Sequence, residues 1–304
     1  MGFDLNSGRP DSKLVQVSIG VPVYNGSIGL ADALESLVNQ TVSDIEIIIS
    51  DNASTDTTPE ICRRYTEQDQ RIVYYRQLTT IPAVDNFLFV LSKARAPYFI
   101  WAAHDDVRSL NFIEKLLPVL EANRSAVLAF GDICDMGSNG IIPSQFTCPE
   151  PGAARWRRLW AVAFSRLPYA YGLWKTDVLR RVTWSDNGWW PDLPLVMSAT
   201  MLGDFVRVSG AELRYQVRDN ARYFDLPPRP GVGGHLSNLL VRVRRAWHMA
   251  RAPVLAAVSV GRVAGFALGL LAGVLTSLKV AYSAAGYFWH WLRVQLGLLP
   301  KPGS

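Results

Sequence analysis

The sequence contains few cysteines and lacks the signature motifs of several common enzyme classes. Its three cysteines, Cys62, Cys134 and Cys148, are odd in number and form no CxxC pair, which argues against a disulfide framework or a zinc site and fits a reducing compartment. No GxGxxG follows the first predicted strand, and GxxxxGK[ST], HExxH and GxSxG are absent. These absences argue against a dinucleotide-binding Rossmann site, a P-loop, a metalloprotease and a serine hydrolase.

Acidic residues are missing from the last quarter of the chain. Residues 226–304 carry nine of the 31 Lys and Arg residues and no Asp or Glu, which leaves 22 basic against 26 acidic residues before them. The net charge of +5 therefore belongs to this basic, apolar tail. Such a segment favours a polyanionic surface as its partner, either a membrane or a nucleic acid. At the other end, residues 1–14 are polar and lack the apolar core of a signal peptide, so we expect a flexible N-terminus.

Apolar strand-like runs alternate with helical patterns from residue 15 onward. The pattern predicts helices over residues 30–40, 58–68, 83–94 and 110–123, and strands over 15–25, 45–50, 71–77, 97–103 and 126–136. The strand runs are apolar on both faces, which is typical of a parallel sheet that is covered by helices on both sides. We therefore predict an α/β fold with a mostly parallel, Rossmann-like sheet.

Polar side chains follow the predicted strands where each strand ends. Asn25 follows the first, Asp51 the second, and Asp105 and Asp106 the fourth. Because ligands of such sheets bind outside the carboxyl ends of the strands, we expect these residues to line one site. Carboxylates without a cysteine or histidine cluster suit Mg²⁺ or Mn²⁺, which usually share their coordination with substrate phosphates.

Three stretches, in this order and spacing, resemble the family 2 glycosyltransferases with a GT-A fold: VSIGVPVYNG, IIISDNASTD and YFIWAAHDD. The resemblance covers about residues 15–220. It implies that Pro22, Tyr24 and Asn25 frame the nucleotide of a nucleotide-diphospho-sugar and that Asp51 contacts its base. It also implies that Asp105 lies near the ribose and Asp106 on the metal. Asn86 falls where relatives often carry an Asn, and His104, where many relatives have an acid, is a candidate additional ligand.

The resemblance divides the chain into a GT-A domain over residues 15–225 and the tail over 226–304. Within the domain, residues 15–136 correspond to the nucleotide-binding half and 137–225 to the acceptor half. An inverting transferase needs a base for the acceptor hydroxyl, and Asp192 matches the family position. An acid after Pro191 also fits a plain helix N-terminus, and the competing candidates for the base are Asp177 and Asp186. Tryptophans crowd this half, and Trp189 and Trp190 are the first candidates for stacking on a substrate.

The sequence thus predicts an inverting, metal-dependent glycosyltransferase whose tail holds it at the cytoplasmic face of the inner membrane. A lipid-linked or cell-surface glycan is then the expected acceptor. Apolar residues interleave the arginines of the tail, which favours a membrane over a nucleic acid, and a helical bundle for homo-oligomerisation is the alternative use of the tail. Whether residues 252–278 cross the bilayer or lie on it stays open. Two other functions stay open: a non-catalytic membrane scaffold that binds a sugar nucleotide or a glycan, and a nucleotidyltransferase, although PVYNGSIG lacks the basic residue that a triphosphate requires.

Overall fold

The computed structural model of the chain describes residues 3–4, 14–137, 140–163, 167–182 and 192–216, together with residue 274. The predicted N-terminal segment 1–14 and tail 226–304 therefore lie almost wholly outside the described residues. Among the residues that are described, no helix has both the length and the apolar character needed to cross a membrane.

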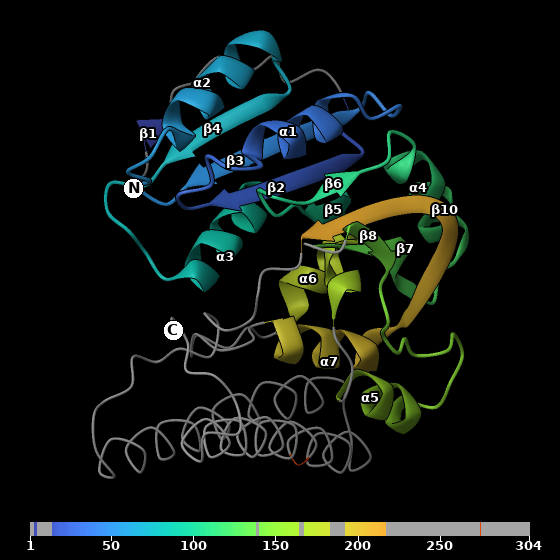
Figure 1. Ribbon diagram of the computed structural model, residues 1–304. Coiled ribbons are helices and arrows are strands. Elements are labelled where there is room, and N and C mark those ends of the chain that lie inside the picture. The colour runs from blue at the N-terminus through green and yellow to red at the C-terminus, as the bar shows by residue number, and fades with distance from the viewer. Residues whose placement is uncertain are drawn as a thin grey trace, which may run out of the picture.

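The first half of the chain forms a parallel sheet with helices between the strands. Its strands are β2 (Val17–Val23), β3 (Ile45–Asp51), β4 (Ile72–Arg76) and β5 (Tyr98–Trp101), and the connecting helices are α1 (Leu30–Val38), α2 (Thr58–Gln68) and α3 (Ala83–Lys93). Helices α1 and α2 lie above these strands and α3 lies below them (Figure 1). Every residue of β2 and β3 is buried, which explains why their sequences are apolar on both faces. The predicted elements are confirmed to within two residues at nearly all of their ends.

The second half continues the same sheet with mixed strand directions. It contains β6 (Val107–Arg108), α4 (Phe112–Ala122), β7 (Ala126–Gly137), β8 (Gly140–Pro143), β9 (Leu173–Lys175) and β10 (Asp204–Gln216). The ten strands run in the order β1-β4-β3-β2-β5-β9-β7-β10-β6, where β1 is Phe3–Asp4 and β8 pairs with β7 alone. Strand β10 is long and strongly curved (Figure 1), and it runs parallel to β7 but antiparallel to β6.

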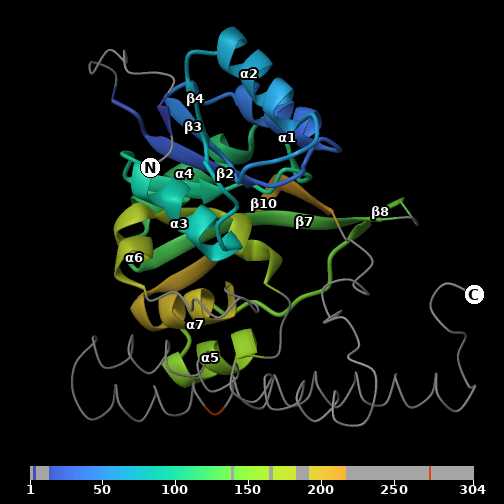
Figure 2. The same cartoon turned by 90° about the vertical axis from the view of Figure 1, so that its left-hand side faces the viewer.

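Helices of the second half pack beneath the sheet. They are α5 (Arg155–Ala163), α6 (Thr176–Arg181) and α7 (Asp192–Leu202), with a short 3₁₀ turn at Pro168–Tyr171 before β9. Helix α7 lies against both α5 and α6, and α5 is the outermost of the three (Figure 2). Large aromatic side chains fill the space between these layers, including Phe130, Tyr169, Trp174 and Phe205.

Strand β2 extends beyond its neighbour β5, and this offset opens the carboxyl edge of the sheet. It pairs with β3 over its full length but with β5 only as far as Gly20 and Trp101. The backbone of Pro22 therefore faces the side where β5 has already ended, which is where a residue without an N–H is tolerated. Strand β5 is shorter than the predicted strand 97–103 because the chain turns away after Ala102. The N–H of Ala102 still donates to the Gly20 carbonyl at 2.8 Å.

Candidate functional site

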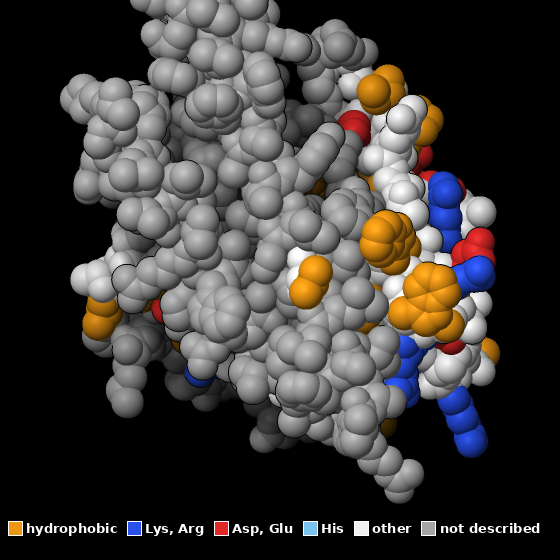
Figure 3. Space-filling view, turned by 90° about the horizontal axis from the view of Figure 1, so that it is seen from below, with side chains coloured by type: hydrophobic (Ala, Val, Ile, Leu, Met, Phe, Trp, Pro, Cys, Tyr) orange, Lys and Arg blue, Asp and Glu red, His pale blue; other side chains and the backbone are white. Residues whose placement is uncertain are grey.

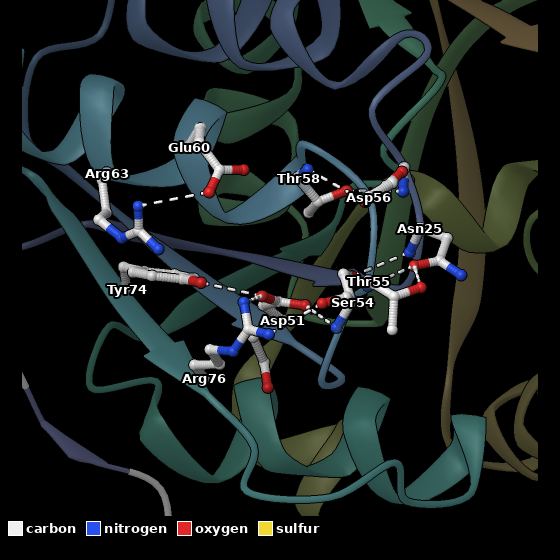
Figure 4. A network of polar contacts seen from close by, with 12 residues as sticks. Asn25, Asp51, Ser54, Thr55, Asp56, Thr58, Glu60, Arg63, Tyr74 and Arg76 are labelled. Carbon is white, nitrogen blue, oxygen red and sulfur yellow. Dashed lines mark hydrogen bonds and ion pairs between the residues drawn. The ribbon is translucent and has the colours of Figure 1, made fainter.

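Three loops that follow β2, β3 and β5 meet at this carboxyl edge. The backbone N–H of Asn25 donates to Ser54 Oγ at 2.9 Å, and the N–H of Thr55 donates back to Asn25 Oδ1 at 2.8 Å (Figure 4). The third loop reaches the first at Gly26, where an added Cβ would lie 2.7 Å from Cδ2 of the His104 ring. The three loops thus lie side by side at one edge, and the prediction that Asn25, Asp51, Asp105 and Asp106 line one site stays a prediction.

The turns of these loops require unusual backbone conformations. Asn25 and Ala53 have positive φ angles of 48° and 58°, and Gly29, which precedes α1, has a φ of 95°. Asn and Gly adopt such conformations more readily than other residues, whereas Ala pays a steric cost. The bonds between the two loops hold the backbone in this conformation, and residues held in this way often cluster at ligand-binding sites.

Asp51 anchors a buried network at the end of β3. Its side chain has no exposed surface, and Oδ1 accepts a hydrogen bond from the N–H of Ser54 at 2.8 Å. Oδ2 accepts from the Tyr74 hydroxyl at 2.9 Å and from Arg76 Nη1 at 3.1 Å (Figure 4). Burial, together with the neighbouring Asp51 charge, raises the pKa of Tyr74 strongly, so the hydroxyl stays a donor. Both oxygens of the Asp51 carboxylate thus accept hydrogen bonds from groups of the protein.

Arg76 carries this network to the surface. Its side chain is 40% exposed, and Nη2 also donates to the Ser54 carbonyl at 2.8 Å. We did not single out Arg76 from the sequence, although it is the last residue of β4 and the strand-end rule that selected Asp51 applies to it equally. Tyr24, half-exposed at 49%, and the exposed Asn25 lie on the neighbouring loop.

Asp56 ties the second loop to the first. Its Oδ2 accepts from the N–H of Ser27 and its Oδ1 from the N–H of Thr58, both at 3.0 Å. Burial raises the pKa of Asp56, but these hydrogen bonds outweigh burial and lower the pKa well below its ordinary value. Asp56 therefore stabilises the turn that follows β3.

The acidic turn His104-Asp105-Asp106 lies between β5 and β6. His104 and Asp105 are partly exposed, whereas Asp106 is 1% exposed. Asp106 Oδ1 accepts a hydrogen bond from the N–H of Gln216, the last residue of β10, at 3.0 Å. Gly29 packs against the Asp105 backbone, since a Cβ at Gly29 would come within 3.2 Å of Asp105 Cα. The turn is thus held from both the nucleotide-binding half and the acceptor half.

A buried arginine follows the acidic turn by two residues. Arg108 is 3% exposed, and its Nη2 donates to the carbonyls of Trp101 at 2.8 Å and Tyr171 at 3.3 Å. Its guanidinium also lies over the Phe112 ring, 5.6 Å from the centroid. Burial lowers the pKa of Arg108 to about 10, although the Asp106 charge opposes the shift. Within the described part of the chain, Nε and Nη1 have no hydrogen-bond partner. In the sequence, Arg108 is an ordinary charged residue and gives no sign of its burial.

Asn86 lies away from the exposed part of this edge. It is 3% exposed on α3, its Oδ1 accepts from Ser50 Oγ at 2.6 Å, and its Nδ2 donates to the Ser50 carbonyl at 3.0 Å. These bonds fasten α3 to β3 one residue before Asp51. In this structure, Asn86 supports the strand that carries Asp51, and the implied contact with the nucleotide-sugar stays a prediction.

The predicted base lies only partly within the described structure. Asp192 is the first residue of α7, so the expected helix start is confirmed, whereas its side chain lies outside the description. Asp177 is exposed on α6, and Asp186, Trp189 and Trp190 belong to residues that are not described. Among the residues that are described, no group of three or more His, Cys, Asp or Glu side chains is arranged to hold a metal ion.

Comparisons with known proteins agree with this architecture. A family model described as "Glycosyl transferase family 2" matches residues 18–173. "Glycosyltransferase GlyG" of Streptococcus pneumoniae serotype 4 is 34% identical over 100 residues, which are 33% of each chain. "Putative glycosyltransferase EpsE" of Bacillus subtilis is 30% identical over 144 residues, 45% of this chain and 50% of that one. The chain thus spans a third to a half of the length of these relatives.

Solved structures share the fold at low sequence identity. Staphylococcus aureus TarS 1–349 in complex with UDP-GlcNAc has a TM-score of 0.56 and 16% identity over 84% of this chain and 76% of that one. The mannosyltransferase PcManGT from Pyrobaculum calidifontis, in complex with GDP-Man and Mn²⁺, has a TM-score of 0.54 and 15% identity over 94% and 81%. The predicted GT-A fold is therefore confirmed. Since the family model also spans just over half of the 304 residues, the chain belongs to glycosyl transferase family 2.

Proposed function

We propose that this protein is an inverting glycosyltransferase that moves a sugar from a nucleotide-diphospho-sugar to an acceptor hydroxyl. The observation that carries the proposal is the junction of three loops at one sheet edge, which joins Asn25, Ser54 and the His104–Asp106 turn. This edge lies within the region that the family model matches. The structural relatives that were solved with UDP-GlcNAc and with GDP-Man support a sugar nucleotide as the donor.

The donor base would sit above the Asp51 network. Because the Asp51 carboxylate is covered, the half-exposed guanidinium of Arg76 is the group that presents this network to a ligand. Tyr24 and Asn25 would frame the base and ribose from the β2 loop, and Asp105 would face the ribose from the opposite loop. Pro22 contributes because it has no N–H and so adds no further hydrogen bond on the side of β2 that faces β5. The room that this leaves between the loops would hold the ligand.

The acidic turn suits a divalent cation that is shared with the donor diphosphate. Mg²⁺ and Mn²⁺ commonly use one or two carboxylates and complete their coordination with phosphates and water, so a cluster of three protein ligands is not required. Asp106 would hold the ion, with Asp105 and His104 beside it. When bound, the ion neutralises the diphosphate as it leaves. The hydrogen bond from the Gln216 N–H to Oδ1 leaves further lone pairs on the Asp106 carboxylate for an ion.

Asp192 is the proposed base. The acceptor hydroxyl gives its proton to the carboxylate while its oxygen attacks the anomeric carbon, and the bond to the nucleoside diphosphate breaks with both electrons going to the leaving oxygen. A single displacement of this kind inverts the anomeric configuration. Asp192 is the first residue of α7, and an acid at the start of a helix is favoured in its ionised form because it complements the helix dipole, which supports this assignment.

A lipid-linked or surface glycan is the proposed acceptor, and the cytoplasmic face of the inner membrane is the proposed location. The composition of residues 226–304, basic and free of acids, supports both. The same tail is also a candidate for self-association.

The test is turnover of UDP-, dTDP- and GDP-sugars with Mn²⁺ or Mg²⁺, with and without a membrane lipid extract. We expect one donor class to release its nucleoside diphosphate, with the activity lost on chelation and in Asp106→Asn. Asp192→Asn should abolish transfer to the acceptor while donor binding is kept. If no sugar nucleotide turns over, the proposal is wrong, and binding of a sugar nucleotide or a glycan without turnover would favour the non-catalytic scaffold.

A further inference from the structure

The outer face of α5 exposes two tryptophans. Trp156 and Trp160 are 52% and 57% exposed, although tryptophan is usually well covered in a folded domain. They are four residues apart, so they lie on the same side of the helix. The buried side of α5 carries Leu159 and Val162, which have no exposed surface, and the helix packs against α7.

Positive charge surrounds this pair. Arg155 and Arg157 are exposed, and the Arg157 guanidinium lies 5.4 Å from the centroid of the Trp156 ring. Arg158 instead turns inward and pairs with Asp204. The chain contains no Asp or Glu between Glu150 and Asp177. In the view from below, large hydrophobic side chains emerge beside Lys and Arg side chains (Figure 3).

We infer that the outer face of α5, formed by Arg155, Trp156, Arg157 and Trp160, binds the surface of an anionic lipid bilayer. Tryptophan rings are favoured at the boundary between headgroups and acyl chains, and arginines are attracted to lipid phosphates. Helix α5 itself carries no Asp or Glu, so it adds no negative charge that an anionic surface would repel. A helix of nine residues buries little area, so this contact fits one that acts together with the basic residues of 226–304.

The position of α5 links this surface to the acceptor half. Helix α5 packs directly on α7, which begins at Asp192, and it lies at the far end of the molecule from α2 (Figure 1). A bilayer bound at α5 would therefore adjoin the half that receives the acceptor. The inference concerns a surface and stands whether or not the proposed transfer reaction is correct.

The test is co-sedimentation of the full chain with vesicles of phosphatidylglycerol or of phosphatidylcholine, without donor or metal. We expect the wild type to prefer phosphatidylglycerol. Trp156→Ser combined with Trp160→Ser should weaken this binding roughly tenfold or more, because apolar area is lost from the contact. Arg155→Gln combined with Arg157→Gln should weaken it about fivefold for each arginine removed.

The matched control is Arg63→Gln combined with Arg64→Gln, which removes the same charge from exposed positions of α2. This control should bind like the wild type. The thermal transitions of all variants should match, so that a loss of lipid binding can be attributed to the changed side chains of α5 and not to unfolding. The inference is overturned if the α5 variants bind as tightly as the wild type, or if the α2 control loses as much. A tryptophan variant that keeps lipid binding but changes the sedimentation coefficient would instead assign this face to a second copy of the chain.

Discussion

The site depends on ionised side chains that are buried beneath its surface. Asp51 is stabilised by three donors, which compensate the cost of removing a carboxylate from water. Asp106 accepts one backbone N–H and lies near Arg108, which itself uses two carbonyls. The two carboxylates therefore differ in their surroundings. Asp51 holds the loops in place, whereas Asp106 lies beside the Arg108 guanidinium and is bonded to the end of β10.

The charge of Arg108 should weaken the affinity of the acidic turn for a second cation. We predict that Arg108→Met binds Mn²⁺ about tenfold more tightly in the presence of a nucleoside diphosphate, because like charges a few ångströms apart repel across a protein interior. Electron paramagnetic resonance of free Mn²⁺ measures the affinity without activity. Arg71→Met, which removes a charge at the amino end of β4, is the control and should change nothing. Equal affinities in all three proteins would show that Arg108 does not influence the turn.

At the residue scale, strand-end position predicted that the loops after these strands meet, but not how deep their side chains lie. Asn25, Asp51 and Asp106 were identified because each follows an apolar run. The burial of Asp51 depends on Tyr74 and Arg76 from β4, and the orientation of Asn86 on α3 depends on Ser50 of β3. These are contacts between separate elements, which no single stretch of sequence contains. Arg108 appears in the sequence as an ordinary charged residue, and only the packing of β6 reveals that it is buried.

At the element scale, an irregularity in β10 brings the acceptor half to the acidic turn. Strand β10 pairs with β7 as far as Arg207, shifts register, and resumes at Glu212, so that Gln216 reaches Asp106. The shift is possible because β7 has a glycine opposite it: a Cβ on Gly131 would lie 1.8 Å from the Ala211 carbonyl oxygen. The periodicity of the sequence did not predict this strand, because its residues alternate irregularly across the shift.

Gly131→Ala should therefore lower the free energy of unfolding by about 3 kcal/mol or more, since backbone atoms cannot move aside as a flexible side chain can. Gly137→Ala, in the same strand, is the control, because a Cβ there meets nothing within 4 Å. Urea unfolding of the two variants gives the comparison. Equal losses of stability would contradict the close approach of β7 and β10.

The link between α5 and β10 should make stability depend on acid pH. Burial raises the pKa of Asp204, but the hydrogen bond from Ser125 and the Arg158 charge outweigh it, so the pKa falls below the ordinary value of 3.8. The stabilisation is therefore fully present above pH 3.8 and is lost as the pH falls through the lowered value. We predict that Asp204→Asn is about 3 kcal/mol less stable at neutral pH. In urea unfolding, the difference should shrink below pH 3.8, and a difference that stays constant with pH would contradict the pairing.

At the scale of the whole molecule, the alternating pattern predicted the elements up to β5 well because strands β2 to β5 are short, mostly apolar runs separated by amphipathic helices. The elements after β5 were predicted less completely, since strands β6, β8 and β9 are two to four residues long and are defined by pairing across the sheet. The carboxyl edge of the sheet carries the three loops, and among the described residues α5 lies at the far end from α2 (Figure 1).

The central claim is that the loops after β2, β3 and β5 form one donor site. Amide hydrogen exchange of the full chain, with and without a nucleoside diphosphate and Mn²⁺, tests it most directly. We predict slower exchange together in residues 24–29, 51–58 and 102–108, with no change in the outer face of α2. Protection of only one of these loops, or protection confined to other parts of the chain, would contradict the account.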